Sequence, residues 1–298
     1  MQHALVMGGA LLVALAIDRW WGEPPARLHP VVWMGHFLNL AGRKFKPKAS
    51  PDVRDLKAFS LAALHWWAGA ALISIAFYAL QWLLLQAHPL VAAAFLGLLL
   101  KPLFAWAMLR SEVQAVEDAL TQSLEAGRSR LAMLVSRDTL KLSETEVRES
   151  AIESLAENLN DSVVAPIFWF VLLGLPGAAV YRFANTADAM WGYRGLRGGV
   201  NWEWAGKWAA WADDVLSWLP ARITALLLAS VASGVNLKTV RDEARKTPSP
   251  NSGWPMAAMA LALGVCLQKP GVYALNPSGR PAEPPDSVLA RKIASKVL

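Results

Sequence analysis

Long apolar stretches without a charged residue are the dominant pattern of this chain. Residues 58–87 contain no Asp, Glu, Lys or Arg, and a helix needs about 20 apolar residues to cross a hydrocarbon core. A second stretch, residues 90–109, is interrupted by Lys101 and Pro102. A lysine at mid-bilayer costs roughly 2.5–3.5 kcal/mol, which the large apolar side chains around it about offset. We therefore predict two crossings, the second kinked at Pro102.

Four other apolar runs are shorter or interrupted, at residues 4–17, 163–181, 223–237 and 254–267. The first lacks the basic flank of a cleaved signal peptide, so we expect it to be retained. Each short run fits a buried core helix about as well as a membrane span. Together the runs predict an all-α, polytopic membrane protein with about four or five segments that enter the bilayer.

Composition agrees with a membrane protein, because 55% of the 298 residues are hydrophobic and only 17% are charged. The single cysteine, Cys266, excludes an intrachain disulfide framework and a cysteine-based metal cluster. The net charge of +6 fits anionic lipid headgroups or anionic substrates. We expect the lipid bilayer as a partner and no nucleic acid.

Two polar regions lie between the apolar runs. Residues 18–57 are rich in Lys and Arg, which places them in the cytoplasm by the positive-inside bias. Residues 110–161 follow two crossings and should return to the same side. We therefore predict one membrane-embedded domain, residues 1–298, with a cytoplasmic helical insertion at residues 110–162.

Helical patterns are visible within the insertion. An apolar stripe that ends at Gly127 predicts one amphipathic helix; its members are Val113, Val116, Leu120 and Leu124. Ser143 and Glu146 have the spacing of a capping box and predict that a second helix starts there. An apolar stripe follows on one face of this second helix, and the other face is acidic.

The acidic face of the second helix carries Glu149, Glu153 and Glu157 at intervals of four, with Asp161 one turn further. Carboxylates so spaced repel one another. One explanation is a solvated acidic surface. However, no Lys or Arg occupies the positions that would relieve the repulsion, and only Arg148 is near. A divalent cation would relieve it, and magnesium prefers one or two carboxylates plus phosphate oxygens.

Further polar motifs lie at the edges of apolar runs: Asn185 with Asp188, Asp213 with Asp214, Arg222, and Ser249 with Asn251. Taken singly, these motifs fit a helix cap, a solvated pair and a turn. Their shared location at the bilayer boundary favours a site for an amphiphilic or membrane-held substrate. Between them a tryptophan stripe predicts an amphipathic helix in the headgroup region, formed by Trp204, Trp208, Trp211 and Trp218.

These motifs, in this order, resemble the CobD/CbiB family, the membrane adenosylcobinamide-phosphate synthases of cobalamin biosynthesis. The resemblance covers nearly the whole chain. It rests on Asp18, Gly22-Glu23-Pro24-Pro25, His29-Pro30-Val31-Val32-Trp33-Met34-Gly35, Ser136-Arg137-Asp138-Thr139, Glu153-Ser154-Leu155-Ala156-Glu157-Asn158 with Asp161, Asn185-Thr186-Ala187-Asp188, Asp213-Asp214, Pro220-Ala221-Arg222 and Ser249-Pro250-Asn251-Ser252-Gly253. The chain departs from the family around the paired aspartates, where Trp211-Ala212 and Ser217 replace the usual Ala-Arg and Asn.

The resemblance implies an ATP-dependent ligase of the bacterial inner membrane that joins adenosylcobyric acid to aminopropanol phosphate or aminopropanol. It implies Mg²⁺ as cofactor, ATP as a substrate, and other membrane enzymes of cobalamin assembly as neighbours. The candidate catalytic residues are Glu153, Glu157, Asp188, Asp213 and Asp214. The candidate magnesium ligands are Glu153, Glu157 and Asp161. The candidate substrate- and phosphate-binding residues are Arg137, Asn158, Asn185, Arg222, Ser249 and Asn251.

A single active site requires these residues to face one side of the membrane. If residues 163–181 crossed once, Asp188 and Asp213 would emerge opposite the cytoplasmic insertion. Gly174-Leu175-Pro176-Gly177 breaks this run, and the loop after it is basic. We therefore predict that residues 163–181 are re-entrant or shielded by protein, with both ends cytoplasmic.

Two rival functions remain open. A transporter or channel for an ion or a corrinoid should place acids inside its spans, whereas these acids lie in loops and at boundaries. A non-catalytic relative of the AmpE type, which also resembles this family, should lack the Glu-x-x-x-Glu and Asp-Asp elements that this chain retains.

Overall fold

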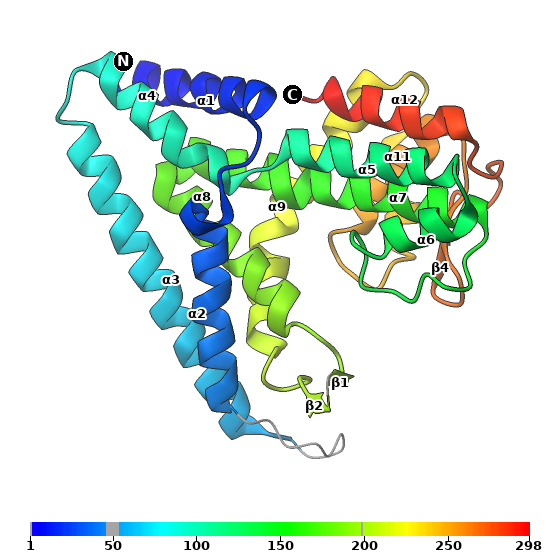
Figure 1. Cartoon of the computed structure of the whole chain (residues 1–298), viewed down its shortest axis with the longest axis horizontal. Coiled ribbons are helices and arrows are strands. Elements are labelled where there is room, and N and C mark those ends of the chain that lie inside the picture. The colour runs from blue at the N-terminus through cyan, green and yellow to red at the C-terminus, as the bar shows by residue number, and fades with distance from the viewer. Residues whose placement is uncertain (1, 46–53, 198) are drawn as a thin grey trace. The chain divides into compact units, whose positions relative to one another are not determined.

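The structure, a computed structural model, describes residues 2–45, 54–197 and 199–298 and consists mainly of helices (Figure 1). Within these residues, five helical segments are long and apolar enough to cross a membrane: Gln2–Trp20, Leu56–Leu84, Pro89–Leu120, Glu144–Trp191 and Lys207–Val231. The predicted all-α, polytopic membrane architecture is confirmed. Part of the predicted cytoplasmic region, residues 46–53, lies outside the described residues.

The chain divides into two compact units, Met1–Ala105 with Ala165–Leu216, and Trp106–Val164 with Ser217–Leu298. The first unit contains α1 (Gln2–Trp20), η1 (Ala26–Leu28), α2 (Pro30–Phe45), α3 (Leu56–Leu84), α4 (Pro89–Leu100), η2 (Lys101–Leu103), α8 (Ala165–Trp191), the antiparallel hairpin of β1 (Leu196–Arg197) and β2 (Val200–Asn201), and the start of α9 (Lys207–Val231). The interruption predicted at Pro102 is confirmed, because α4 ends at Leu100 and a 3₁₀ turn follows.

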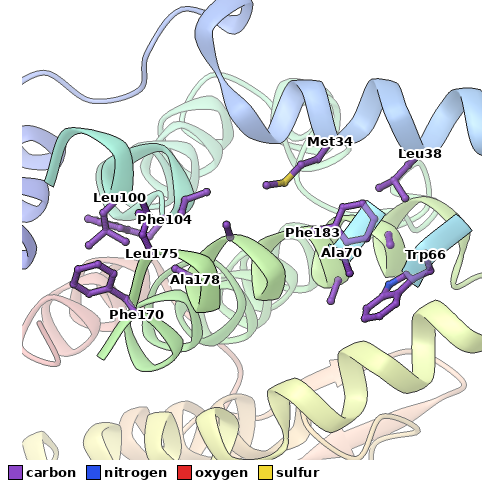
Figure 2. Close-up of a cluster of buried hydrophobic side chains, with 14 of the residues drawn as sticks. Met34, Leu38, Trp66, Ala70, Leu100, Phe104, Phe170, Leu175, Ala178 and Phe183 are labelled. Atoms are coloured by element: carbon purple, nitrogen blue, oxygen red, sulfur yellow. The ribbon is translucent and has the colours of Figure 1, made fainter. Parts of the chain in front are cut away.

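The core of the first unit lies where α8 packs against α2 and α3, while α1 lies along α4 (Figure 1). Met34, Leu38, Trp66 and Phe183 lie toward one end of this core (Figure 2). A side chain at Gly69 would collide with the rings of Phe183 and Phe37, so glycine permits the close approach of α3 and α8.

Helix α8 is broken at Gly174, whose φ of +72° and ψ of −159° are not helical. This conformation is open essentially to glycine alone. The side-chain oxygen of Gln81 accepts a hydrogen bond from the freed Leu175 N–H at 2.7 Å. Residues 165–173 span about 13 Å at 1.5 Å per residue, less than half of a hydrocarbon core of about 30 Å. The break supports a re-entrant segment, and the side on which its ends lie stays a prediction.

The second unit surrounds one central helix. It contains α5 (Trp106–Leu120), α6 (Leu124–Leu131), α7 (Glu144–Leu159), the π turn η3 (Asn160–Val164), the rest of α9, α10 (Leu237–Ala244), α11 (Gly253–Leu263), the antiparallel hairpin of β3 (Leu267–Lys269) and β4 (Tyr273–Leu275), and α12 (Pro284–Ser295). Helix α7 is in contact with α5, α6, α11, α12 and β3. The predicted insertion, residues 110–162, lies in this unit together with the C-terminal part of the chain.

Helix caps explain where the helices of this unit start. The predicted capping box is confirmed, because Ser143 Oγ accepts from Glu146 N at 3.3 Å and Glu146 Oε2 accepts from Ser143 N at 2.7 Å. The prediction of one helix up to Gly127 is wrong. Ser123 caps a new helix by accepting from Ala126 N, so α5 ends at Leu120 and Gly127 lies inside α6.

Two other predictions about the C-terminal half change. The tryptophan-rich segment and the run that starts at residue 223 form one helix, α9, which continues through Pro220. Trp208 and Trp211 pack at ring distances of 6.4 and 6.0 Å from Phe59 of α3, although Trp211 stays half exposed.

The run 254–267 is a core element, because α11 has only 11 residues and most of them are buried.

Candidate functional site

The acidic row of α7 is buried within the second unit. Six of the 16 residues of α7 are charged, whereas residues 162–181 contain no Asp, Glu, Lys or Arg, so α7 lies outside the apolar, membrane-embedded part of the segment Glu144–Trp191. Glu149 and Glu153 are each only 1% exposed. The solvated-face explanation is therefore wrong for these two residues, because helices and a strand cover every side of α7.

An arginine from the segment between α6 and α7 fixes Glu153. Arg137 Nη2 donates to Glu153 Oε2 at 3.0 Å, and its Nη1 donates to Ser150 Oγ at 3.0 Å. Within the described residues, Glu153 Oε1 and Glu149 Oε2 are buried and have no hydrogen-bond partner. Buried carboxylate oxygens without a donor are unfavourable, so this place is suited to a cationic ligand.

Burial raises the pKa of these carboxyl groups. It raises the pKa of Glu149 to about 7. A hydrogen bond from the Ala282 N–H lowers this pKa, and repulsion by Glu153 raises it further. It also raises the pKa of Glu153, opposed chiefly by Arg137. Glu157 is half-buried, yet its pKa rises to about 7 through burial and then through repulsion by Asp161 and Glu153. Burial and mutual repulsion therefore disfavour the ionised form of these carboxyl groups, which a bound cation would favour.

The geometry limits what kind of metal site the row could form. Among the residues that the structure describes, no three His, Cys, Asp or Glu side chains come together as metal ligands. Asp161 lies on the π turn η3 and acts on Glu157, whose pKa it raises by repulsion. The chemistry of the donors fits a magnesium ion bound by one or two carboxylates and completed by phosphate oxygens and water. The assignment of Glu153, Glu157 and Asp161 as magnesium ligands stays a prediction.

Asn158 turns toward its own helix. Its Nδ2 donates to Ser154 O at 3.0 Å and to Ser154 Oγ at 3.3 Å. The structure thus gives Asn158 a local partner, and its predicted contact with substrate is untested.

Arg222, Ser249 and Asn251 come together beside α9. Arg222 Nη1 donates to Asn251 Oδ1 at 2.8 Å, and Nη2 donates to Pro250 O at 3.1 Å. Ser249 Oγ accepts from the backbone N–H groups of Asn251 and Ser252, both at 3.2 Å. The hydrogen bonds from Arg222 to the turn 249–252 therefore bring the three predicted phosphate-binding residues together as one cluster in the second unit.

The other predicted residues belong to the first unit. Asn185 Nδ2 donates to Asp213 Oδ1 at 3.3 Å, and Arg182 Nη1 donates to Asn185 Oδ1 at 3.2 Å. Asp188 lies almost one turn further along α8, and Asp214 follows Asp213 on α9. The structure thus joins Asn185 with Asp213, and the single predicted set of site residues is divided between the two units.

A buried charge network in the first unit was missed as a site by the sequence reasoning. Lys101 Nζ lies 3.2 Å from Asp18 Oδ1 and 2.8 Å from Glu23 Oε1, and both Lys101 and Asp18 are 2% exposed. His29 Nε2 lies 3.3 Å from the other oxygen of Glu23. Burial opposes ionisation of Glu23, yet hydrogen bonds from His29 and Lys101 hold its pKa below the usual range.

This network borders a largely apolar cavity of about 1160 Å³ in the first unit. Its lining includes Glu23 and Lys101 together with residues from α1, α2, α3 and α4. The sequence did contain a signal for this network. Lys101 lies alone inside one apolar run, and Asp18 and Glu23 lie at the end of another run, with Glu23 78 positions away from Lys101.

Comparisons with known proteins give consistent results. A family model described as "CobD/Cbib protein" matches residues 11–297. "Probable cobalamin biosynthesis protein CobD" of Thermococcus kodakarensis is 45% identical over 274 residues, which cover 91% of this chain and 85% of that protein. The protein of the same name from Methanothermobacter thermautotrophicus is 39% identical over 277 residues, covering 89% and 86%.

A third relative is similar over a comparable length. "Cobalamin biosynthesis protein CobD" of Dehalococcoides mccartyi is 36% identical over 282 residues, covering 92% of this chain and 88% of that protein. No solved structure matches the chain.

Proposed function

This chain belongs to the CobD/CbiB family, and from this premise we propose that it forms an amide bond in cobalamin biosynthesis with ATP as the driving substrate. The carboxyl group comes from adenosylcobyric acid, and the amine comes from aminopropanol phosphate or aminopropanol. With the phosphorylated amine, the product is adenosylcobinamide phosphate. The reaction takes place at the cytoplasmic face of the bacterial inner membrane.

The chemistry defines what the protein must supply. A carboxylate and an amine do not condense unaided in water, so the carboxylate oxygen first attacks the terminal phosphorus of ATP, which releases ADP and leaves an acyl phosphate. The amine nitrogen then attacks the acyl carbon, the carbon–oxygen bond to phosphate breaks, and the amine loses a proton. Both steps gather negative charge on phosphate oxygens and require cations nearby.

The observation that carries the proposal is the buried Glu153 of α7 with its arginine and with the half-buried Glu157 beside it. Glu153 is 1% exposed, Arg137 holds one of its oxygens at 3.0 Å, and the other oxygen has no partner within the described residues. Glu153 and Glu157 would hold a magnesium ion that neutralises phosphate charge when it is bound. Arg137 orients Glu153, and Glu157 lies one turn away on the same face.

Other residues bind substrate in this proposal. Arg222, held by Asn251, contacts phosphate oxygens, with Ser249 beside it. Arg137 and Asn158 contact the nucleotide or the amine. Asn185, Asp188, Asp213 and Asp214, which belong to the first unit, stay candidate residues of that unit.

The test is an ATP-dependent assay on the purified full-length protein with adenosylcobyric acid and either amine. We expect Glu157→Gln to abolish magnesium-dependent amide formation while the protein still inserts in the membrane. Glu125→Gln, at an exposed position of α6 in the same unit, is the matched control and should keep wild-type activity. Full activity of Glu157→Gln would remove the metal assignment, and no amide product from the wild-type protein would refute the function.

A further inference from the structure

A basic pocket in the second unit extends beyond the residues proposed above. It has a volume of about 660 Å³ and lies between α9, α10 and the segment 247–250. Its lining holds three arginines, Arg222, Arg241 and Arg245, and two tryptophans, Trp218 and Trp254. No Asp or Glu is among the described residues that line it. The pocket therefore has the charge of a receptor for an anion.

The guanidinium of Arg222 is held in place by neutral groups only. It donates to Asn251 Oδ1 at 2.8 Å, to Pro250 O at 3.1 Å and to Trp218 O at 2.6 Å. It also lies over the rings of Trp218 and Trp254, 4.3 and 4.8 Å from their centroids. These contacts orient the planar fork without neutralising its charge, which is how arginine is prepared to bind a phosphate.

Arg241 lies on α10, and Arg245, four residues later, is the C-cap of this helix. Like charges at this spacing repel one another, and both side chains are exposed. Neither side chain makes a hydrogen bond or ion pair with the described part of the chain. Two acids lie between them in the sequence. Glu243 is engaged by Lys246 at 2.6 Å and by the N–H of Asn276 at 2.6 Å, and Asp242, exposed like the two arginines, forms no ion pair with either of them in the described part of the chain. The two guanidinium groups are thus available to a ligand in the pocket.

The hydroxyl of Ser249 completes the lining. Its oxygen accepts two backbone hydrogen bonds, and a hydroxyl has two acceptor positions and one donor. The proton of Ser249 is therefore available to an oxygen of the ligand. Three guanidiniums and one hydroxyl donor match a ligand with several charged oxygens, and the volume is within the usual range of about 300–1,000 Å³ for small-molecule sites.

We propose that this pocket binds a multiply charged phosphate group, with Arg241 and Arg245 as phosphate-binding residues beside Arg222. The identification of this group as the triphosphate of ATP rests on the proposed function. The phosphates of anionic lipids present the same chemistry from a second source, because the protein is embedded in a bilayer.

Binding to the full-length protein in discs of uncharged phosphatidylcholine tests the pocket. Equilibrium dialysis would measure the Kd of ATP and of pyrophosphate in EDTA, which removes any metal-dependent binding at α7. We expect Arg241→Gln/Arg245→Gln to weaken both on the order of tenfold or more, since hydrogen bonds to charged groups are among the stronger ones. The control Lys238→Gln/Lys292→Gln removes the same charge from exposed positions of α10 and α12 outside the pocket and should leave both Kd values unchanged.

A second arm uses discs that contain phosphatidylglycerol. If lipid phosphate is the ligand, this lipid competes with ATP, and the arginine variant loses binding to phosphatidylglycerol vesicles while the control keeps it. Unchanged affinity of the arginine variant for ATP, pyrophosphate and anionic vesicles would overturn the proposal. Arginine-dependent phosphate binding without amide synthesis by the wild-type protein would count against the proposed function alone. Normal ATP binding by the variant with normal synthesis would count against the pocket alone.

Discussion

Replacement of Lys101 by methionine tests whether the buried charge network holds the first unit together. Lys101 and Asp18 are each 2% exposed, and the ammonium also donates to Phe104 O at 3.2 Å. Lys101→Met keeps an unbranched side chain of similar length, so the change in packing is small. What it removes is the positive charge that compensates Asp18 and Glu23.

The size of the effect follows from burial and distance. Removing one partner of a buried pair costs about 3–5 kcal/mol because the other charge is left uncompensated. Two unit charges 3.2 Å apart attract by about 5 kcal/mol at an effective dielectric constant of 20, which agrees with this range. Glu23 adds less, because it is 19% exposed and water can reach it. We expect Lys101→Met to lower the free energy of unfolding by about 3–5 kcal/mol.

Urea unfolding of the full-length protein in detergent, followed by tryptophan fluorescence, measures this loss. Asp18→Asn/Lys101→Met should recover part of the stability, because the two changes act on one ion pair and are not additive. Lys57→Met, at an exposed position of α3, should lie within about 0.5 kcal/mol of the wild type. A loss below about 1 kcal/mol for Lys101→Met, or a double variant less stable than the single one, would refute the reasoning.

Two further predictions concern the start of α7 and the break in α8. Ser143→Ala removes the acceptor of the Glu146 N–H and should cost about 1 kcal/mol in the same urea assay; an unchanged midpoint would mean that this cap is dispensable. Gly174→Ala forces a Cβ onto a φ of +72° and against the amide of Gln81, so it should cost about 1–3 kcal/mol. Its control, Gly8→Ala in α1, meets no atom within 4 Å and should be neutral or stabilising; equal effects at both positions would contradict the strain at Gly174.

Local signals in the sequence predicted helix starts well where the chemistry is local. Ser143 and Glu146 form their capping box within four residues, so no distant contact can hide it. The end of α5 was mispredicted because an apolar stripe continues through Leu124 while Ser123 starts a new helix. Apolar content alone could not separate α11 from a membrane span either. Helix α11 is buried because α7 and α10 pack against it, and this information lies outside its own sequence.

The sequence predicted which residue types form the candidate site, but only part of the structure that surrounds them. The spacing of Glu149, Glu153 and Glu157 is visible in the sequence, but the elements that bury them come from both sides of α7 along the chain. Periodicity therefore indicated one solvent-facing side where the structure has none for Glu149 and Glu153. Asp161 lies on a π turn after α7, and a four-residue spacing cannot show this turn.

Structural cations and candidate ligand-binding cations differ in whether acidic side chains neutralise their charge. Arg148, 3% exposed, meets Glu117 and Glu144 at 2.9 Å, and Lys101 meets two acids in the other unit. Such pairs are what burial of a charge requires, and they need no ligand. Arg222 is oriented as firmly, yet its hydrogen bonds within the described residues go to carbonyl and amide oxygens alone. An arginine that is fixed but not neutralised is prepared to bind an anion from outside the chain. This property suits the pocket around Arg222 to a phosphate group.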